Sequence, residues 1–192
     1  MQNKKLLLAG VFIAAFFLNN VSAQSKKSSG IAAVKGNSYL NVGVGIGSYG
    51  LAGTGGFPFT ASYEYGVAKN ISAGVGLGYV KRKFATDDKY TYLIFEARGS
   101  YHFNELLQLA NPKLDVYAGA GLVYRRYSYK YTVLFPGDEG QAAYTTDYKT
   151  SGGNVDAELH AGGRYLFNEH IGAYAEVGYG ISPLQLGLTL VF

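Results

Sequence analysis

Alternation of apolar and small or polar residues at every second position is the feature that most constrains this fold. From Tyr39 to Gly47, branched aliphatic side chains occupy the even positions, while asparagine and glycine follow the first tyrosine at the odd positions. Side chains of a β-strand point alternately to the two faces of a sheet, whereas a helix repeats every 3.6 residues. The stretch therefore predicts a strand with one oily face and one small face.

The same period of two recurs in seven further stretches, with no sustained helical period between them. The predicted strands span residues 39–47, 59–67, 71–79, 93–103, 114–125, 155–165, 171–179 and 184–192. Single-chain bacterial outer-membrane barrels have an even number of antiparallel strands. The prediction is therefore an all-β fold, a closed eight-stranded antiparallel transmembrane β-barrel.

The connections between these strands differ in length. Lys69-Asn70 and Asn168-Glu169 predict short turns, and residues 104–113 a turn that includes one helical turn. Residues 82–89 predict a polar loop. Residues 128–153 predict the longest irregular stretch, with Pro136-Gly137-Asp138 as turn residues and with tyrosines and threonines able to extend the flanking strands. Long loops are expected outside the cell and short turns in the periplasm.

Alternation alone does not say whether the oily face points inward, as in a soluble lipocalin-like barrel, or outward to lipid. The opposite face consists mainly of glycine and serine, which would cover a soluble barrel poorly, and only 16% of the residues are charged against roughly 25% in a typical soluble domain. Aromatic residues also gather at both ends of the apolar stripes, as the two interfacial girdles of a membrane barrel do. They are Phe59, Tyr79, Tyr124 and Tyr179 at one rim and Tyr65, Tyr101, Phe103, Tyr165 and Phe192 at the other.

The N-terminal segment, residues 1–23, is predicted to be an export signal peptide. Lys4 and Lys5 precede an apolar run that is shorter than the roughly 20 residues of a spanning helix, and Val21-Ser22-Ala23 offers small residues for cleavage. Residues 24–38 predict a flexible periplasmic lead-in and residues 39–192 the barrel. Export and alternation together predict location in the cell outer membrane.

Nine charged residues occupy inward-facing positions of the predicted strands. They are Glu64, Glu96, Arg98, Asp115, Arg125, Asp156, Glu158, Arg164 and Glu176. The interior of an eight-stranded barrel is just wide enough for side chains, and isolated buried charges are very costly. We therefore expect a network of paired charges that plugs the lumen, with a gated path for protons or ions as the alternative.

No metal site, cofactor or catalytic residue is predicted. The chain has no cysteine, and His102, His160 and His170 show no close ligand spacing, so they are assigned to packing or to a turn. His160 near Asp156 and Glu158 is the nearest catalytic candidate, but its inward position in mid-strand argues against access by a substrate. Without Lys4 and Lys5 the formal charge falls from +4 to +2, which is too small to predict nucleic-acid binding.

A group of basic residues lies near the predicted outer rim. Its members are Lys81, Arg82, Lys83, Lys89, Arg126 and Lys130. They form either a solvated rim that aids solubility or a contact surface. As a contact surface they would bind phosphates of outer-membrane lipids, lipopolysaccharide included, or an acidic external partner.

Two segments carry a resemblance to a known family. Residues 178–192, GYGISPLQLGLTLVF, resemble the last hairpin of small OmpA/OmpX-type barrels, especially the porin-like barrels of Bacteroidetes, and residues 95–103, FEARGSYHF, are similar to an inner strand of the same proteins. The resemblance covers residues 39–192 and implies a fold rather than an activity. It also implies that the outer-membrane assembly machinery recognises the last strand through Phe192.

The leading functional hypothesis is a structural or surface-interaction barrel that acts through its external loops. A narrow pore for ions or small solutes is the alternative, and an outer-membrane enzyme is less favoured.

Overall fold

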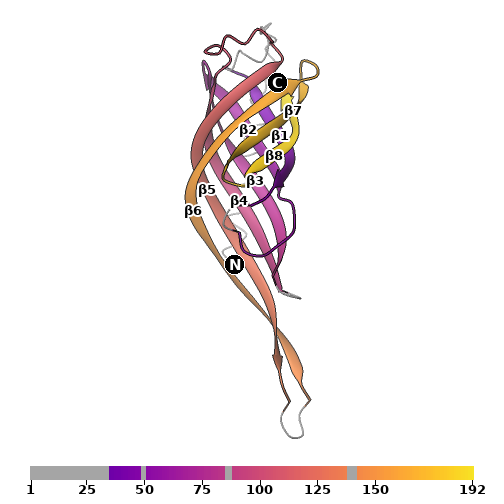
Figure 1. Cartoon of the computed structure of the whole chain (residues 1–192). Coiled ribbons are helices and arrows are strands. Elements are labelled where there is room, and N and C mark those ends of the chain that lie inside the picture. The colour runs from indigo at the N-terminus through magenta and orange to yellow at the C-terminus, as the bar shows by residue number, and fades with distance from the viewer. Residues whose placement is uncertain (1–34, 49–50, 85–87, 138–141) are drawn as a thin grey trace.

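The structure is a computed structural model that describes residues 35–48, 51–84, 88–137 and 142–192 (Figure 1). Within these residues the chain forms eight strands: β1 (Ser38–Ile46), β2 (Phe59–Ala68), β3 (Ile71–Phe84), β4 (Asp88–His102), β5 (Leu114–Phe135), β6 (Tyr144–Leu166), β7 (Ile171–Tyr179) and β8 (Leu184–Val191). Each strand pairs antiparallel with the next, and β8 pairs back with β1 to close the ring. The predicted closed eight-stranded antiparallel barrel is confirmed.

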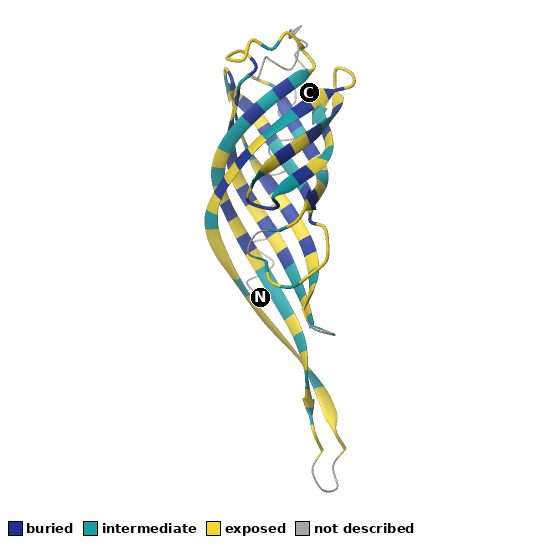
Figure 2. Cartoon of the chain, in the orientation of Figure 1, coloured by how far each residue is buried: buried dark blue, intermediate teal, exposed yellow. Residues whose placement is uncertain are grey.

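The oily face of the sheet points outward. Leu77 and Leu188 are 53% and 59% exposed, whereas the inward-facing Glu64 and Arg164 are fully buried. Figure 2 shows buried and exposed residues alternating along the barrel strands. Apolar side chains outside and polar side chains inside are the arrangement of a membrane barrel and the reverse of a soluble one. In the described part of the chain, no helix is both long and apolar enough to cross a membrane.

Short turns lie at one end of the barrel. At Lys69-Asn70, between β2 and β3, Asn70 has φ 61°, a left-handed conformation that asparagine tolerates better than most residues. Between β4 and β5, the amide of Leu107 donates to the carbonyl of Phe103 over 2.8 Å, which closes the predicted single helical turn. The Asn168 side chain accepts from the backbone amide of Ile171 at the turn before β7.

Long strands project from the other end, and two loop predictions are wrong there. Residues 82–89 were expected to be a loop, but β3 continues to Phe84 and β4 begins at Asp88, with Lys83 paired opposite Lys89. Residues 128–153 were expected to be mostly irregular, but β5 and β6 stay paired as far as Phe135 and Tyr144 and form a hairpin beyond the barrel (Figure 1).

The hairpin is held by cross-strand contacts between aromatic residues, which local sequence patterns do not reveal. The rings of Tyr131 and Tyr148 stack with centroids 5.5 Å apart, and those of Phe135 and Tyr144 with centroids 5.1 Å apart. Aromatic and β-branched side chains favour strands mainly through such pairs. The tyrosines and threonines of this stretch do extend the flanking strands, as the sequence suggested.

The two ends of the barrel sheet meet near the short turns. The amide of Ser38 donates to the carbonyl of Phe192 over 2.7 Å, and β1 begins at Ser38, one residue earlier than expected. The predicted signal peptide, residues 1–23, and most of the predicted lead-in, residues 24–38, lie outside the described residues.

Candidate functional site: a charged lumen and a tyrosine-lined mouth

Seven of the nine charged residues predicted to face inward lie together in the middle of the lumen. All seven are at most 5% exposed. They are Glu64, Glu96, Arg98, Asp115, Glu158, Arg164 and Glu176. Strand alternation places each of them on the inner face, and closure of the ring brings together residues from β2, β4, β5, β6 and β7.

Arg164 occupies the centre of this group. Its Nη1 donates to Oδ2 of Asp115 over 2.8 Å, and its Nη2 donates to Oε1 of Glu64 over 2.9 Å. The ring centroids of Tyr117 and Tyr39 lie 4.0 and 4.6 Å from its guanidinium carbon, within the range of cation–π attraction. The buried cation is thus held both by carboxylates and by aromatic faces.

Arg98 forms a second centre of the network. It donates to both carboxylate oxygens of Glu176, over 3.2 and 2.6 Å, in the bidentate geometry that suits a guanidinium. Its Nη1 also lies 3.7 Å from Oε2 of Glu96, and its Nε lies 3.8 Å from Oε1 of Glu64. Glu64 therefore lies between the two buried arginines and links their groups of partners.

The two lumen histidines also belong to the network, although the sequence predicted only a packing role for them. His102 bridges Asp115 and Ser72, with Nδ1 2.8 Å from Oδ1 of Asp115 and Nε2 2.9 Å from Oγ of Ser72. Ser72 donates in turn to Oε2 of Glu64 over 2.7 Å. The alternation of residues along the strand placed His102 on the inner face. Its partners come from neighbouring strands, so spacing along the chain could not reveal them.

His160 makes an equivalent bridge on the other side of Glu64. Its Nδ1 lies 2.6 Å from Oε1 of Glu158, and its Nε2 lies 2.8 Å from Oγ of Ser100, which donates to the same Oε2 of Glu64 over 2.6 Å. The two bridges therefore meet at the same carboxylate oxygen of Glu64.

Apolar layers, which were not among the features predicted from the sequence, lie at both ends of the charged network. The outer layer consists of Val80, Tyr92, Ile94, Val123 and Ile181. The inner layer, near the short turns, consists of Tyr39, Leu166 and Val191. Except for Ile181, which lies in the turn between β7 and β8, these residues occupy inward positions within the strands, and those positions were the signal that could have revealed them. A hydrated ion would have to cross an apolar layer at either end of the lumen.

Arg125 and Asp156 differ from the other seven predicted lumen charges, because they lie on the outer side of the apolar layer. Nη1 of Arg125 lies 3.3 Å from Oδ2 of Asp156, and Nη2 of Arg125 donates to the carbonyl of Gly180 over 2.8 Å. The Asp156 side chain is 38% exposed and also accepts from the Tyr179 hydroxyl. This pair belongs to the mouth of the barrel rather than to its sealed interior.

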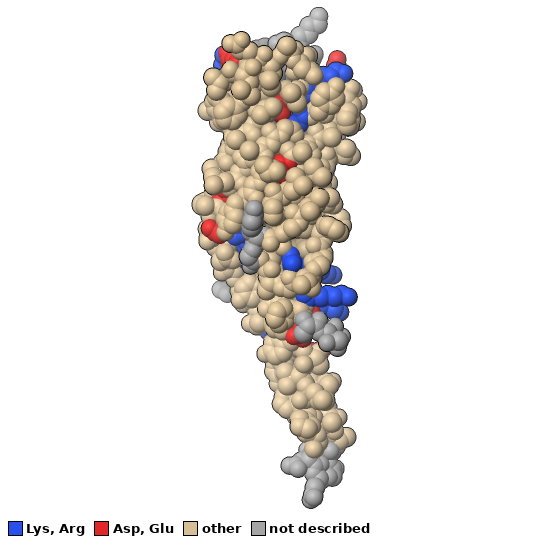
Figure 3. All heavy atoms as spheres, in the orientation of Figure 1, with Lys and Arg blue, Asp and Glu red and all other residues tan. Residues whose placement is uncertain are grey.

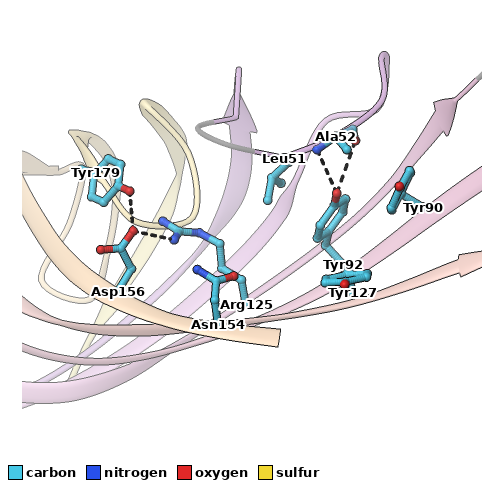
Figure 4. A pocket seen from close by; sticks show the side chains of 9 residues that line it. All are labelled: Leu51, Ala52, Tyr90, Tyr92, Arg125, Tyr127, Asn154, Asp156 and Tyr179. Atoms are coloured by element: carbon cyan, nitrogen blue, oxygen red, sulfur yellow. Dashed lines mark hydrogen bonds and ion pairs between the residues drawn. The ribbon is translucent and has the colours of Figure 1, made fainter. Parts of the chain in front are cut away.

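The mouth contains a cavity of about 330 Å³ above the outer apolar layer (Figure 4). Its wall combines tyrosine rings with the ion pair and with a loop that follows β1. The lining residues are Leu51, Ala52, Tyr90, Tyr92, Arg125, Tyr127, Asn154, Asp156 and Tyr179. The amide of Ala52 donates to the Tyr92 hydroxyl over 2.9 Å, which holds the loop against the wall.

Five of the six predicted rim cations are exposed on the outward face of the projecting strands. They are Lys81, Lys83, Lys89, Arg126 and Lys130. Arg82 differs, because its guanidinium donates to the carbonyl of Gly53 over 2.6 Å and to the hydroxyl of Ser48. Arg82 thus holds the loop between β1 and β2. Among the described residues, no group of three or more His, Asp or Glu side chains is arranged to hold a metal ion.

The closed ring of eight antiparallel strands, with an apolar exterior and a polar interior, decides the fold type. The chain has the fold of a closed eight-stranded antiparallel β-barrel, with side chains filling its interior. Neither a protein-family model nor a curated protein matches the sequence.

Solved structures similar to this barrel include three bacterial proteins. The N-terminal β-barrel domain of Pseudomonas aeruginosa OprF is 15% identical with a TM-score of 0.49, over 82% of this chain and 98% of that one. Ail of Yersinia pestis is 14% identical with a TM-score of 0.46, over 82% and 95%. Neisserial surface protein A is 15% identical with a TM-score of 0.49, over 81% and 94%.

Proposed function

We propose that the chain is an integral outer-membrane protein whose plugged barrel anchors the β5–β6 hairpin for contacts outside the cell. One observation carries the proposal. Beyond Tyr124, which belongs to the aromatic girdle, β5 continues to pair with β6 through residues 125–135. At about 3.3 Å per residue this is roughly 35 Å of additional paired strand. A barrel that served only as a membrane plug would not need this projection.

The edge of the hairpin suggests the class of partner. β6 pairs with β7 only from Leu159 inward, so in the described chain Tyr144–Glu158 has β5 on one side and no strand on the other. Unpaired backbone amides and carbonyls along such an edge can accept an added strand. We therefore infer that the partner is a protein that presents an extended segment.

Site-specific photo-crosslinking on intact cells tests this proposal. A photoreactive residue at Thr145, exposed on the hairpin, should give adducts with external proteins, while the same residue at Leu106, in a turn at the opposite end, should not. Protease added to intact cells should also cut the hairpin and leave the barrel protected. Adducts only from Leu106, or a hairpin that is protected from external protease, would overturn the proposal.

A narrow path for protons is the alternative function, and one observation favours it. The hydrogen bonds from Asp115 through His102, Ser72 and Glu64, and onward to Ser100, His160 and Glu158, are continuous. The apolar layers at both ends oppose this alternative. An enzymatic role for His160 is not proposed, because its side chain is only 1% exposed behind the outer layer.

A further inference from the structure

Four lysines form a single row across four neighbouring strands. Lys83 of β3 stands directly opposite Lys89 of β4, Lys89 opposite Lys130 of β5, and Lys130 opposite Lys149 of β6. All four are exposed, and directly opposite residues share one face of a sheet. With strands about 4.8 Å apart, the lysine row is roughly 14 Å long. Lys149 was not among the cations predicted from the sequence.

The lysine row has few opposite charges near it. Lys81 and Arg126 lie on the same face and add two more cations. Among the described residues on this face, Asp147 is the one carboxylate, and it accepts from the hydroxyl of Thr132 over 2.8 Å. Asp88 lies on the opposite face, where it accepts from the Tyr129 hydroxyl. Like charges placed directly opposite destabilise a sheet, so anions bound between the three consecutive lysine pairs would stabilise it.

The face that carries the lysine row continues the lipid-facing face of the barrel. Lys83 is four residues beyond Tyr79 of the outer girdle on β3, and Lys130 is six residues beyond Tyr124 on β5. With a strand tilt of about 40°, these positions lie roughly 10 and 15 Å above the girdle. Figure 3 shows basic side chains gathered where the barrel narrows into the hairpin. The lysines thus lie at the height of the lipid headgroups, and their spread in height suits a headgroup that carries anions at more than one depth.

We propose that the row Lys83–Lys89–Lys130–Lys149 binds the phosphorylated sugar headgroup of an outer-leaflet glycolipid of the lipopolysaccharide class. Each phosphate bridges ammonium groups on adjacent strands, which replaces lysine repulsion with charge-assisted hydrogen bonds. The inference rests on the outer-membrane location proposed above and adds a lipid to the protein partner. The two proposals can fail separately, because the crosslinking experiment at Thr145 leaves all four lysines unchanged.

The test is a titration of fluorescent lipopolysaccharide into the whole barrel, refolded in zwitterionic micelles. Each lysine near an anionic surface contributes about 1 kcal/mol, so K89Q with K130Q should weaken binding roughly 30-fold. A matched control, K69Q with K113Q, removes two exposed lysines at the opposite end and should bind like the wild type. Binding should also weaken steeply as salt is added.

A second readout separates binding from folding. Without glycolipid, K89Q with K130Q should unfold at a higher temperature than the wild type, because lysine repulsion is relieved. Added lipopolysaccharide should raise the unfolding temperature of the wild type more than that of the variant. Equal binding of lipopolysaccharide by the wild type and by K89Q with K130Q would overturn the proposal. An equal loss of affinity in K89Q with K130Q and in K69Q with K113Q would overturn it as well. Undiminished binding of dephosphorylated lipopolysaccharide would also overturn it, because phosphate would then not be the recognised group.

Discussion

Replacing Arg164 with methionine is the sharpest perturbation of the lumen network. Methionine keeps much of the length of the side chain but donates no hydrogen bond and carries no charge. The change removes donors that lie 2.8 and 2.9 Å from Asp115 and Glu64, and it removes the cation between the rings of Tyr39 and Tyr117. The side chain is fully buried, so bulk solvent does not reach the two carboxylates that lose their partner.

The expected loss follows from the partners that remain. Removal of one partner of a buried ion pair costs about 3–5 kcal/mol. Glu64 keeps the hydroxyls of Ser72 and Ser100, and Asp115 keeps His102. Because each carboxylate keeps other partners, we count the loss of stability as that of one buried ion pair rather than two. A desolvated cation–π contact adds up to about 2 kcal/mol. We expect Arg164→Met to lower the free energy of unfolding by about 4–6 kcal/mol.

Equilibrium unfolding by urea from zwitterionic vesicles measures this loss. Circular dichroism should follow the transition, because the chain contains no tryptophan. Arg126→Met removes an exposed arginine and should change the free energy of unfolding by no more than about 0.5 kcal/mol. If Arg164→Met proved as stable as the wild type, or if Arg126→Met lost as much, the buried network would not be what holds the lumen together.

Three further predictions concern other parts of the barrel. Leu77→Arg and Leu188→Arg, on the outward face, should each lower the stability of the inserted barrel by about 2–4 kcal/mol near the bilayer midplane, and unchanged urea midpoints in vesicles would contradict the face assignment. Deleting Phe192 should lower the amount of the barrel protein in outer-membrane fractions of cells. Normal amounts at native expression levels would contradict the role of Phe192 as an assembly signal. Lys69 donates to Glu105 at the end of the barrel with the short turns and lowers the pKa of that carboxyl, so their contact is present at neutral pH and lost as the pH falls through the lowered value. NMR titration of Lys69→Met should show the Glu105 pKa rising, and an unchanged pKa would argue against the contact.

Most strands of the barrel could be predicted because their signal is local. β7 runs from Ile171 to Tyr179, as the alternation indicated, and β2 ends one residue beyond its predicted end. The sequence predicted the outer parts of β5 and β6 as mainly irregular and offered strand extension only as a possibility, because residues such as Tyr131 and Tyr148 show no apolar alternation. They become strand through their stacking across the pair, which depends on the register of the two strands.

The site was predictable in its faces but not in its partners. Alternation placed Arg164 and Glu64 inside, yet their contact joins residues 100 positions apart and depends on how the ring closes. The outer apolar layer separates the sealed network from the mouth pair, and in it Ile94 lies between Tyr92 and Glu96 on the inner face of β4. The contact of Arg82 with Gly53 could not be predicted, because it depends on a loop whose path has no periodic signal.

Planar-bilayer recording of the purified wild-type barrel tests most directly whether the protein is a plugged anchor rather than a pore. Water-filled porins need about 16 to 18 strands, whereas side chains fill the interior of an eight-stranded barrel. Here the charged network and the two apolar layers occupy that interior. We expect no stable conductance from the wild type. Reproducible conductance steps on the nanosiemens scale, absent from a mock preparation, would contradict the plug and favour the pore.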